Sequence, residues 1–571
     1  MTLVLTDNLP LLAGAPNGIK KLRELILELA VRGKLVPQNP SDEPASELLK
    51  RIAAEKTRLV AEGKIRKQKP PLVAISEEDR PFEVPTSWAY ARLSEITTKL
   101  TDGSHNPPKD AGSGFPMLSS RDVTAGKIRF DNPSRYLSAD DFDAEDFRTR
   151  TQPGDVLLTI VASLGRSAVV PIDAPKFALQ RSVAVIASGL YPEFLSNLFN
   201  SPVSLRYFDA HAKGTAQKGI YLGKLGEYVA PVPPLAEQHR IVAKVDELMA
   251  LCNRLEAQQT DAESAHTQLL QALLDSLTQA SDATDFAANW QRLAEHFHTL
   301  FTTEPSIDAL KQTLLQLAVM GKLVPQDPSD EPASELLKRL ANGKAELVRS
   351  GLLKAPKPLP DIKQDEIPYE LPQAWKWVRL GEISEFANGD RGKNYPNRTE
   401  YVSAGIPWIN TGHIEPDGTL SQDSMHFITR EKFESLNGGK IRLGDLVYCL
   451  RGATFGKTAI VDPYRDGAIA SSLMIIRPFE PCSNRYIYRY LTSKIGRDQI
   501  FRFDNGSAQP NLSANNVRLY VYPLPPLPEQ HRIVAKLDQL MTLCDQLKTR
   551  LTQARQLNEQ LASTLVEQAV A

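Results

Sequence analysis

The chain has 571 residues, of which 42% are hydrophobic and 24% are charged, and its formal net charge is −1. This length predicts several domains, and no apolar run is long enough to cross a bilayer, so no membrane contact is expected. The near-neutral charge argues against a protein that coats nucleic acid nonspecifically. The four cysteines lack metal-binding spacing, so we expect neither disulfides nor structural zinc. The first residues lack the pattern of a signal peptide, which favours a cytoplasmic location.

Residues 1–56 predict an N-terminal helical region. Leucines at helical spacing indicate a helix over 22–31, which ends before Gly33. A shorter helix is expected to follow, with Ser41 as its N-cap and Pro44 in its first turn. Residues 57–85 are rich in proline and predict an extended linker.

Residues 86–232 contain short β-branched runs such as DVLLTIV, broken by Gly, Asp and Asn. This pattern predicts a domain that is mostly β and ends with helical residues 192–208. Residues 233–280 carry apolar side chains at alternating three- and four-residue spacing, from Ile241 to Leu255, which predicts one long helix of the coiled-coil type.

The same order then occurs again. Residues 30–51 read AVRGKLVPQNPSDEPASELLKR and residues 318–339 read AVMGKLVPQDPSDEPASELLKR. The tail PPLAEQHRIVAKVDELM, which begins at Pro233, returns as PPLPEQHRIVAKLDQLM at Pro525. The second copy comprises a central helical region at 281–344, a Pro-rich linker at 345–372, a second β-rich domain at 373–524 and a second long helix at 525–571.

Because the ends match and the middles differ, the sequence predicts two different binding domains on one duplicated frame. The fold class that follows is an α+β multidomain protein with an internal pseudo-two-fold repeat. In it, two mostly β domains with helices are separated by two long antiparallel coiled-coil helices. The alternative is a duplicated gene whose middle segments drifted without a purpose.

Motifs that resemble catalytic sites are incomplete. The NPP at 106–108 resembles an adenine methyltransferase motif, but Lys109 stands where that motif has an aromatic residue. The segment GATFGKT at 452–458 resembles a phosphate-binding loop, but Arg451 stands where the leading glycine is required. We therefore predict no catalytic residue, no metal site and no cofactor bound by this chain.

Loops that follow equivalent strands of the two middles carry Arg, Lys, Asn, Ser and His, which hydrogen-bond phosphates and base edges. A helix at 484–501 also interleaves basic and aromatic residues, although a solvated helix face gives the same pattern. The candidate DNA contacts in the first middle are Ser104, His105, Asn106, Lys109, Ser120, Arg121, Arg166, Lys213, Gln217 and Lys218. Those in the second are Arg391, Lys393, Asn394, Tyr395, Asn410, Thr411, His413, Arg451, Lys457, Arg489, Lys494, Arg497, Gln509 and Asn511.

The GKLVPQ head, the PPLxEQHRIVAKxDxLM tail and the two dissimilar middles resemble the specificity subunits of type I restriction–modification systems over essentially the whole chain. The resemblance implies that each middle is a target recognition domain and that the two long helices act as a molecular ruler. It also implies that the repeated ends dock partners, with these candidates: Glu237, Gln238, Arg240, Glu529, Gln530 and Arg532.

The resemblance further implies double-stranded DNA, two methyltransferase (M) subunits and restriction (R) subunits as partners. AdoMet, ATP and Mg²⁺ are then expected on those subunits. The function implied is the reading of a bipartite, asymmetric DNA site by a non-catalytic subunit. The alternatives are a specificity subunit whose single partner chain carries both modification and cleavage, a stand-alone methyltransferase or nuclease, and a coiled-coil scaffold without DNA affinity.

Overall fold

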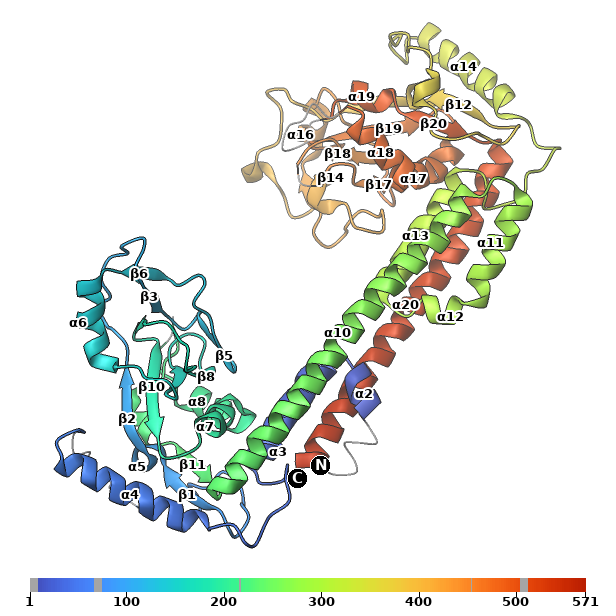
Figure 1. Cartoon of the computed structure of the whole chain (residues 1–571). Coiled ribbons are helices and arrows are strands. Elements are labelled where there is room, and N and C mark those ends of the chain that lie inside the picture. The colour runs from blue at the N-terminus through green and yellow to red at the C-terminus, as the bar shows by residue number, and fades with distance from the viewer. Residues whose placement is uncertain (1–8, 66–73, 215–216, 453, 504–511, 571) are drawn as a thin grey trace. The chain divides into compact units, whose positions relative to one another are not determined.

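The computed structural model describes residues 9–65, 74–214, 217–452, 454–503 and 512–570. The chain divides into two compact units (Figure 1). Unit 1 comprises residues 1–262 and 554–571, and unit 2 comprises residues 263–553. No helix among the described residues is both long and apolar enough to span a membrane.

The helices of unit 1 are α2 (Leu9–Gly14), α3 (Gly18–Val31), α4 (Ala45–Ala61), α5 (Leu93–Ile96), α6 (Ala139–Thr149), α7 (Pro192–Asn200), α8 (Pro202–His211), α9 (Leu222–Gly226) and the first part of α10 (Leu235–Gln279). Its strands are β1 (Ala89–Arg92), β2 (Thr97–Asp102), β3 (Phe115–Leu118), β4 (Val123–Thr124), β5 (Lys127–Ile128), β6 (Arg135–Leu137), β7 (Val156–Thr159), β8 (Ser167–Val169), β9 (Ala178–Leu179), β10 (Val183–Ser188) and β11 (Val229–Val232).

The α-helices of unit 2 are α11 (Ala283–Glu295), α12 (Phe297–Leu300), α13 (Glu304–Val319), α14 (Ala333–Arg349), α15 (Leu380–Ile383), α16 (Arg430–Ser435), α17 (Asn484–Thr492), α18 (Lys494–Phe501), α19 (Ala514–Arg518) and the first part of α20 (Leu527–Val570). Its 3₁₀ helices are η1 (Gln364–Glu366), η2 (Arg398–Glu400), η3 (Thr411–His413) and η4 (Pro481–Ser483). Its strands are β12 (Lys376–Arg379), β13 (Ser384–Asn388), β14 (Ile406–Ile409), β15 (His426–Ile428), β16 (Leu446–Cys449), β17 (Thr458–Ile460), β18 (Ala468–Ile469), β19 (Leu473–Pro478) and β20 (Val521–Leu524).

The sheets of the two units correspond strand for strand. The four-stranded sheet β2-β10-β7-β8 of unit 1 matches β13-β19-β16-β17 of unit 2. The three-stranded sheet β6-β3-β9 matches β15-β14-β18, and in both the last pair is parallel. The pair β1-β11 matches β12-β20, whereas the hairpin β4-β5 has no described counterpart. The predicted repeat is therefore visible in the topology of the divergent middles.

Each unit packs its four-stranded sheet on a pair of short helices. In unit 1, α7 lies against β7 and β8, and both α7 and α8 contact α3 (Figure 1). In unit 2, α17 lies against β17, and both α17 and α18 contact α13. The side chains of β7 and β16 are buried throughout, which explains why their sequences are continuous apolar runs.

The two long helices pass from one unit to the other. The start of α10 and the end of α20 belong to unit 1, and the end of α10 and the start of α20 belong to unit 2, so the helices run in opposite directions. The predicted apolar seam is buried at Ile241, Cys252, Ile533 and Cys544, where it contributes to the core of the respective unit.

The predicted glycine after the first helix is confirmed, but the predicted N-cap of the next helix is wrong. Gly33 has φ +71°, and a Cβ atom there would lie 2.6 Å from Cγ of Pro85. Helix α4 begins at Ala45 with Pro44 as its N-cap residue, so Ser41 lies too far upstream to cap it. The same correction applies in unit 2, where α14 has Pro332 as its N-cap residue.

Candidate functional site

Two segments that carry candidate residues of the first middle line one cavity of about 240 Å³ in unit 1. One loop contributes Asp102 and His105, and another contributes Lys213 and Gln217. The segment that follows β7 supplies the cavity wall at 160–161. Arg181 and Tyr221 also line the cavity, and neither was among the sequence candidates. Arg181 carries no periodic or motif signal, because it lies in the turn between β9 and β10 and only the contact of that turn with the first loop brings it there.

Backbone contacts place the first loop across strand β9. A Cβ atom on Gly103 would lie 2.1 Å from the carbonyl oxygen of Leu179, so only glycine fits. The Ser104 amide donates to that same carbonyl at 2.7 Å, and the Arg181 amide donates to the Ser104 carbonyl at 2.9 Å. Ser104 is buried by these bonds, so the prediction that its side chain contacts DNA is wrong, and the next residue, His105, reaches the surface instead.

An ionic group holds His105 at the cavity. Its Nε2 lies 2.8 Å from Oδ2 of Asp102. The Asp102 carboxylate also accepts a bond from Nη2 of Arg148, whose Nε donates to the Asp102 carbonyl at 2.9 Å. Arg148 belongs to α6, so these two bonds connect α6 to the end of β2, where the loop begins.

The second cavity loop turns on a glycine as well. Gly214 has φ +111°, and the amide of Lys213 donates to the carbonyl of Gly219 at 2.9 Å. The Lys213 and Gln217 side chains are exposed at the cavity. The neighbouring Lys218 pairs with Asp209 at 2.7 Å on the surface of α8.

The other candidates of the first middle lie outside this cavity. Asn106, Lys109 and Arg166 are exposed. The Ser120 amide donates to the Ser182 hydroxyl at 3.0 Å. Arg121 donates to the main-chain carbonyl of Asn132 at 2.9 Å, so part of its guanidinium is already hydrogen-bonded within unit 1.

In unit 2, the loop after β13 follows the same course as the loop after β2. A Cβ atom on Gly389 would lie 2.3 Å from the carbonyl oxygen of Ala470, which parallels the close approach at Gly103. Asp390 accepts from two backbone amides, and these bonds hold the pKa of its carboxyl below its usual value. Arg391 and Lys393 emerge from this loop with exposed side chains.

The neighbouring candidates make hydrogen bonds and packing contacts within the second domain itself. Asn394 donates to the carbonyl of Ser435 at 2.7 Å, and Tyr395 packs edge-on against Trp408. Asn410 accepts from the amide of Gly412 at 2.9 Å, and Thr411 is half-buried beside it.

His413 does not face solvent. Its ring is 3% exposed, its Nδ1 accepts from the Asn410 amide at 3.2 Å, and burial lowers its pKa. The prediction that His413 contacts a base edge is therefore wrong, because the ring is used to shape its own loop.

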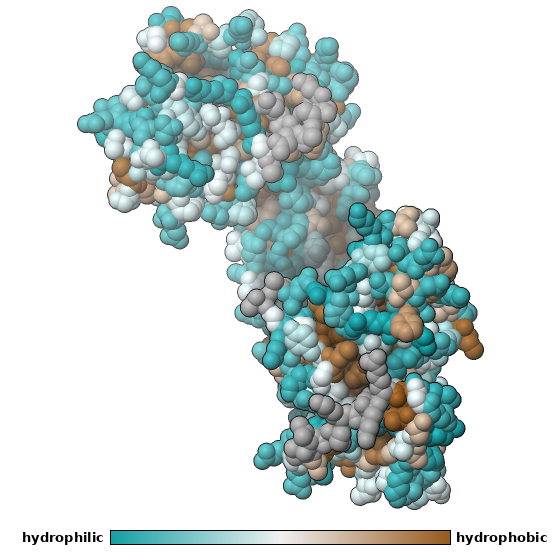
Figure 2. Space-filling view, turned by 90° about the vertical axis from the view of Figure 1, so that its left-hand side faces the viewer, coloured by the Kyte–Doolittle hydropathy of each residue, from teal (hydrophilic) through white to brown (hydrophobic). Residues whose placement is uncertain are grey.

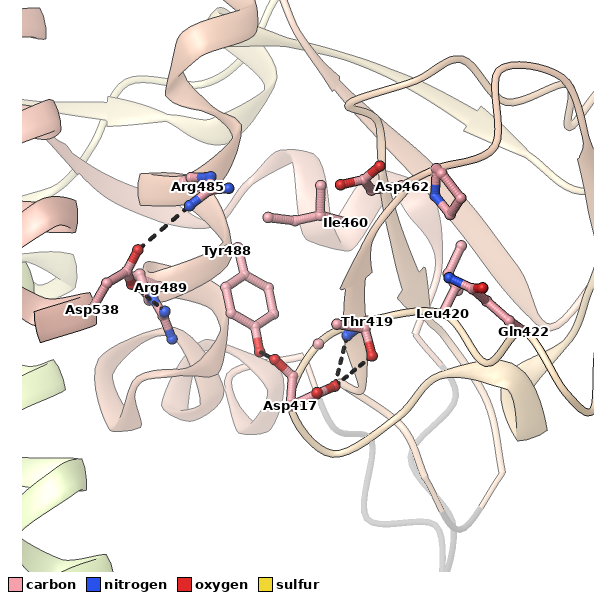
Figure 3. A pocket seen from close by; sticks show the side chains of 12 residues that line it. Asp417, Thr419, Leu420, Gln422, Ile460, Asp462, Arg485, Tyr488, Arg489 and Asp538 are labelled. Atoms are coloured by element: carbon pink, nitrogen blue, oxygen red, sulfur yellow. Dashed lines mark hydrogen bonds and ion pairs between the residues drawn. The ribbon is translucent and has the colours of Figure 1, made fainter. Parts of the chain in front are cut away.

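A larger cavity of about 460 Å³ lies where the second middle meets the long helix α20 (Figure 3). Arg485 and Arg489 of α17 both bond the carboxylate of Asp538 in α20. Tyr488 donates to the carbonyl of Asp417 at 2.9 Å across the same cavity (Figure 3). The predicted DNA contact at Arg489 is thus corrected, because its guanidinium fastens α17 to α20.

The rest of the basic helical stretch is mixed in its exposure. The tyrosines of α17 point into the core, and Lys494 pairs with Asp498 at 2.8 Å. Arg451 and Arg497 are exposed, and Lys457 lies 3.4 Å from a main-chain carbonyl. The candidates Gln509 and Asn511 lie outside the described residues.

The Glu and Gln of each repeated EQHR segment are buried, whereas the His is exposed and the Arg is partly exposed. Glu237 is 1% exposed and accepts from Nε1 of Trp88 at 3.0 Å and from Nε2 of Gln38 at 2.6 Å. Gln238 is buried and accepts from the Tyr191 amide at 2.8 Å. Burial raises the pKa of the Glu237 carboxyl, although its two hydrogen bonds oppose this effect.

Unit 2 repeats this arrangement. Glu529 accepts from Nε1 of Trp375 at 2.9 Å, Gln530 is buried, and burial raises the pKa of Glu529. Arg240 and Arg532 are paired with Asp42 and Asp330 of their own units. The predicted docking role of the four buried side chains, Glu237, Gln238, Glu529 and Gln530, is therefore corrected: they hold the head, the β-rich domain and the long helix together within each unit. Arg240 and Arg532 are about one third exposed, and their docking role stays a prediction.

The model of the type I restriction modification DNA specificity domain family matches residues 93–263 and 372–555. The type I restriction enzyme EcoAI specificity subunit of Escherichia coli is 38% identical to this chain, over 97% of the chain and 94% of the relative. The chain belongs to this family of specificity subunits. The EcoEI specificity subunit of Escherichia coli is also 38% identical, with the same shares of both chains covered.

The specificity-subunit fold is found among solved structures as well. A chain from a study of complex assembly and conformational transition of the type I restriction–modification system aligns with a TM-score of 0.50 and 20% identity. The alignment covers 86% of this chain and 99% of the solved one. At this identity the likeness concerns the fold alone.

Proposed function

We propose that this chain selects the DNA sequence on which a type I restriction–modification complex acts. In this proposal residues 86–232 and 373–524 each read one half of a bipartite, asymmetric site. The observation that carries it is the convergence of His105, Arg181 and Lys213 on one cavity of the first domain, formed by loops whose equivalents in the second domain differ. Such donors and acceptors suit phosphates and base edges.

The long helices set the distance between the two half-sites in this proposal. They have 45 and 44 residues, which at about 1.5 Å per residue gives each a length of roughly 65 Å. A spacing of about one turn of DNA, roughly 34 Å, lies within that reach.

The chain contributes selection and no chemistry in this proposal. Two methyltransferase subunits supply AdoMet, and the restriction subunits supply ATP and Mg²⁺. The visible surface is mostly hydrophilic (Figure 2) and the formal net charge of the chain is −1, so tight DNA binding is assigned to the complex with the methyltransferase subunits. Incubating the purified chain alone with DNA and labelled AdoMet is expected to transfer no methyl group.

Methylome sequencing of cells that carry the chain with its partners tests the central proposal. The expected result is one asymmetric motif with two specified halves around an unread spacer. Replacing residues 86–232 by the corresponding domain of another specificity subunit should change one half only. A change in both halves at once would contradict independent reading by the two domains.

A further inference from the structure

The imidazole of His105 is oriented by a carboxylate that is itself held in place. Nε2 lies 2.8 Å from Oδ2 of Asp102, and the Asp102 side chain is only 10% exposed. An ionised carboxylate only accepts hydrogen bonds, so Nε2 of His105 carries the proton of the neutral ring. The bond from Arg148 to the other oxygen of Asp102 fixes the plane of that carboxylate.

The remaining nitrogen, Nδ1, is therefore a hydrogen-bond acceptor. Among the described residues no donor to this atom is found, and the side chain is 52% exposed at the cavity. The nearby Arg181 and Lys213 offer donors only. In the major groove the donors that a side-chain acceptor reads are the N6 amine of adenine and the N4 amine of cytosine.

We propose that His105 is a specificity-determining residue that accepts a hydrogen bond from the exocyclic amine of one adenine or cytosine in the half-site read by the first domain. Asp102 and Arg148 are positioning residues that select the acceptor form of the ring at Nδ1. This inference rests on the proposed DNA-reading function.

The second domain carries the opposite chemistry at the equivalent place. Arg391 lies two residues after Gly389, as His105 lies two residues after Gly103, and both glycines cross a neighbouring strand at the same close approach. An arginine only donates, and guanine O6 and N7 are its usual partners. The two loops thus favour an amine in one half-site and a guanine in the other.

A double substitution of protein and base tests the proposal. The full chain, in complex with its methyltransferase subunits, is assayed for binding to duplexes that carry the mapped site. Each adenine of the first half is replaced in turn by purine, which lacks the N6 amine, and each cytosine by pyrimidin-2-one, which lacks the N4 amine. Binding is measured rather than methylation, because an exocyclic amine can also be the methyl acceptor. The wild-type complex should lose about tenfold in affinity at one position, the effect of one hydrogen bond of about 1.4 kcal/mol.

His105→Ala should show the same loss on natural DNA and no further loss when that amine is removed. Arg391→Ala is the matched control: it should stay sensitive to the amine in the first half and relax the second half instead. Equal sensitivity of His105→Ala and the wild type to every amine would overturn the proposal, as would a wild type that is insensitive throughout.

The role of Asp102 in orienting His105 is tested separately. Arg148 donates to one oxygen of Asp102, so in Asp102→Asn the single amide oxygen stays with Arg148 and the amide NH2 faces Nε2. The ring proton then moves to Nδ1, so Asp102→Asn should lose the amine preference, as should Asp102→Ala, which frees the ring. A wild-type amine preference in both variants would remove Asp102 from the proposal. A wild-type complex that methylates no specific site would instead contradict the proposed function, which keeps the two failures apart.

Discussion

Unit 1 and unit 2 attach their β-rich domains to the long helices with opposite electrostatics. In unit 2, Asp538 of α20 accepts bonds from Arg485 and Arg489. The carboxylate in the same place of the repeat in unit 1 is Asp246 of α10, and it faces Glu193 rather than an arginine. Burial, and then the negative charge of Glu193, raise the pKa of Asp246.

The ion pairs that bind the two Pro-rich linkers also differ, and unit 2 again has the closer pair. Arg379 of unit 2 is 4% exposed and donates to both oxygens of Glu366, at 3.0 and 2.7 Å. Its counterpart in unit 1, Arg92, reaches Asp79 only at 3.5 Å near the surface. The Trp–Glu bond between domain and long helix is the same in both units. The two copies of the repeat therefore share the buried Trp–Glu hydrogen bond and differ in the charged residues around it.

The largest difference should appear when the two arginines that bind the linkers, at the ends of β1 and β12, are replaced. Arg379→Met leaves the half-buried Glu366 with Arg502 as its remaining ion-pair partner and should lower the stability of unit 2 by about 2 kcal/mol. The matched variant Arg92→Met should cost under about 1 kcal/mol in unit 1, because that pair is longer and better solvated. Hydrogen exchange of the backbone amides in β12 and β20, compared with those in β1 and β11, measures the two losses of stability. Equal losses would contradict the difference between the units.

Acid should weaken unit 2 through Glu366. The hydrogen bond from Arg379, with smaller contributions from Lys363 and Arg502, lowers the pKa of Glu366 to about 2, whereas an unfolded glutamate has about 4.3. The stabilisation, roughly 2 kcal/mol, is complete above about pH 5 and is lost as the pH falls toward 2. Urea unfolding of the wild type and Glu366→Gln should therefore differ at pH 7 and converge near pH 2.5; a constant gap would contradict this linkage.

Loss of the shared Trp–Glu hydrogen bond should destabilise the two units equally. Glu237→Ala leaves Nε1 of Trp88 and the Gln38 amide without their acceptor, and Glu529→Ala does the same to Trp375 and Gln326. Each variant should lose about 2 kcal/mol in its own unit, mainly the cost of the buried indole donor left unpaired, because Gln38 and Gln326 are exposed to water. Hydrogen exchange resolved by unit is the measurement. Unequal losses would show that the two frames are not equivalent.

The smallest effects should have opposite signs. Asp538→Asn removes the partner of two arginines and should destabilise unit 2 by at most about 1 kcal/mol. Asp246→Asn removes a charge that faces Glu193 and should stabilise unit 1 by a few tenths of a kcal/mol at neutral pH. Both shifts in thermal unfolding should shrink in 0.5 M salt. The same sign for both variants would contradict the contrast.

Much of the architecture was predictable from the sequence. The duplication, the β-rich middles and the two long helices follow from repeated text and apolar spacing, which report local backbone preference and burial. Most of the failed predictions concern polar side chains. Glu237 and His413 are residue types that often lie at the surface, yet both are buried. Distant Trp88 donates to Glu237, whereas the His413 ring accepts from Asn410 in its own loop.

The sequence alone determined that one frame is used twice, because near-identical heads and tails fold by the same local rules. Only the tertiary structure decided which polar residues are free to meet a ligand. Arg181 reaches the cavity because the turn after β9 contacts the loop of His105, and the guanidinium of Arg489 is bound by Asp538 of α20. Such pairings join residues tens of positions apart, and a hydrogen bond depends on placement in space rather than on spacing along the chain.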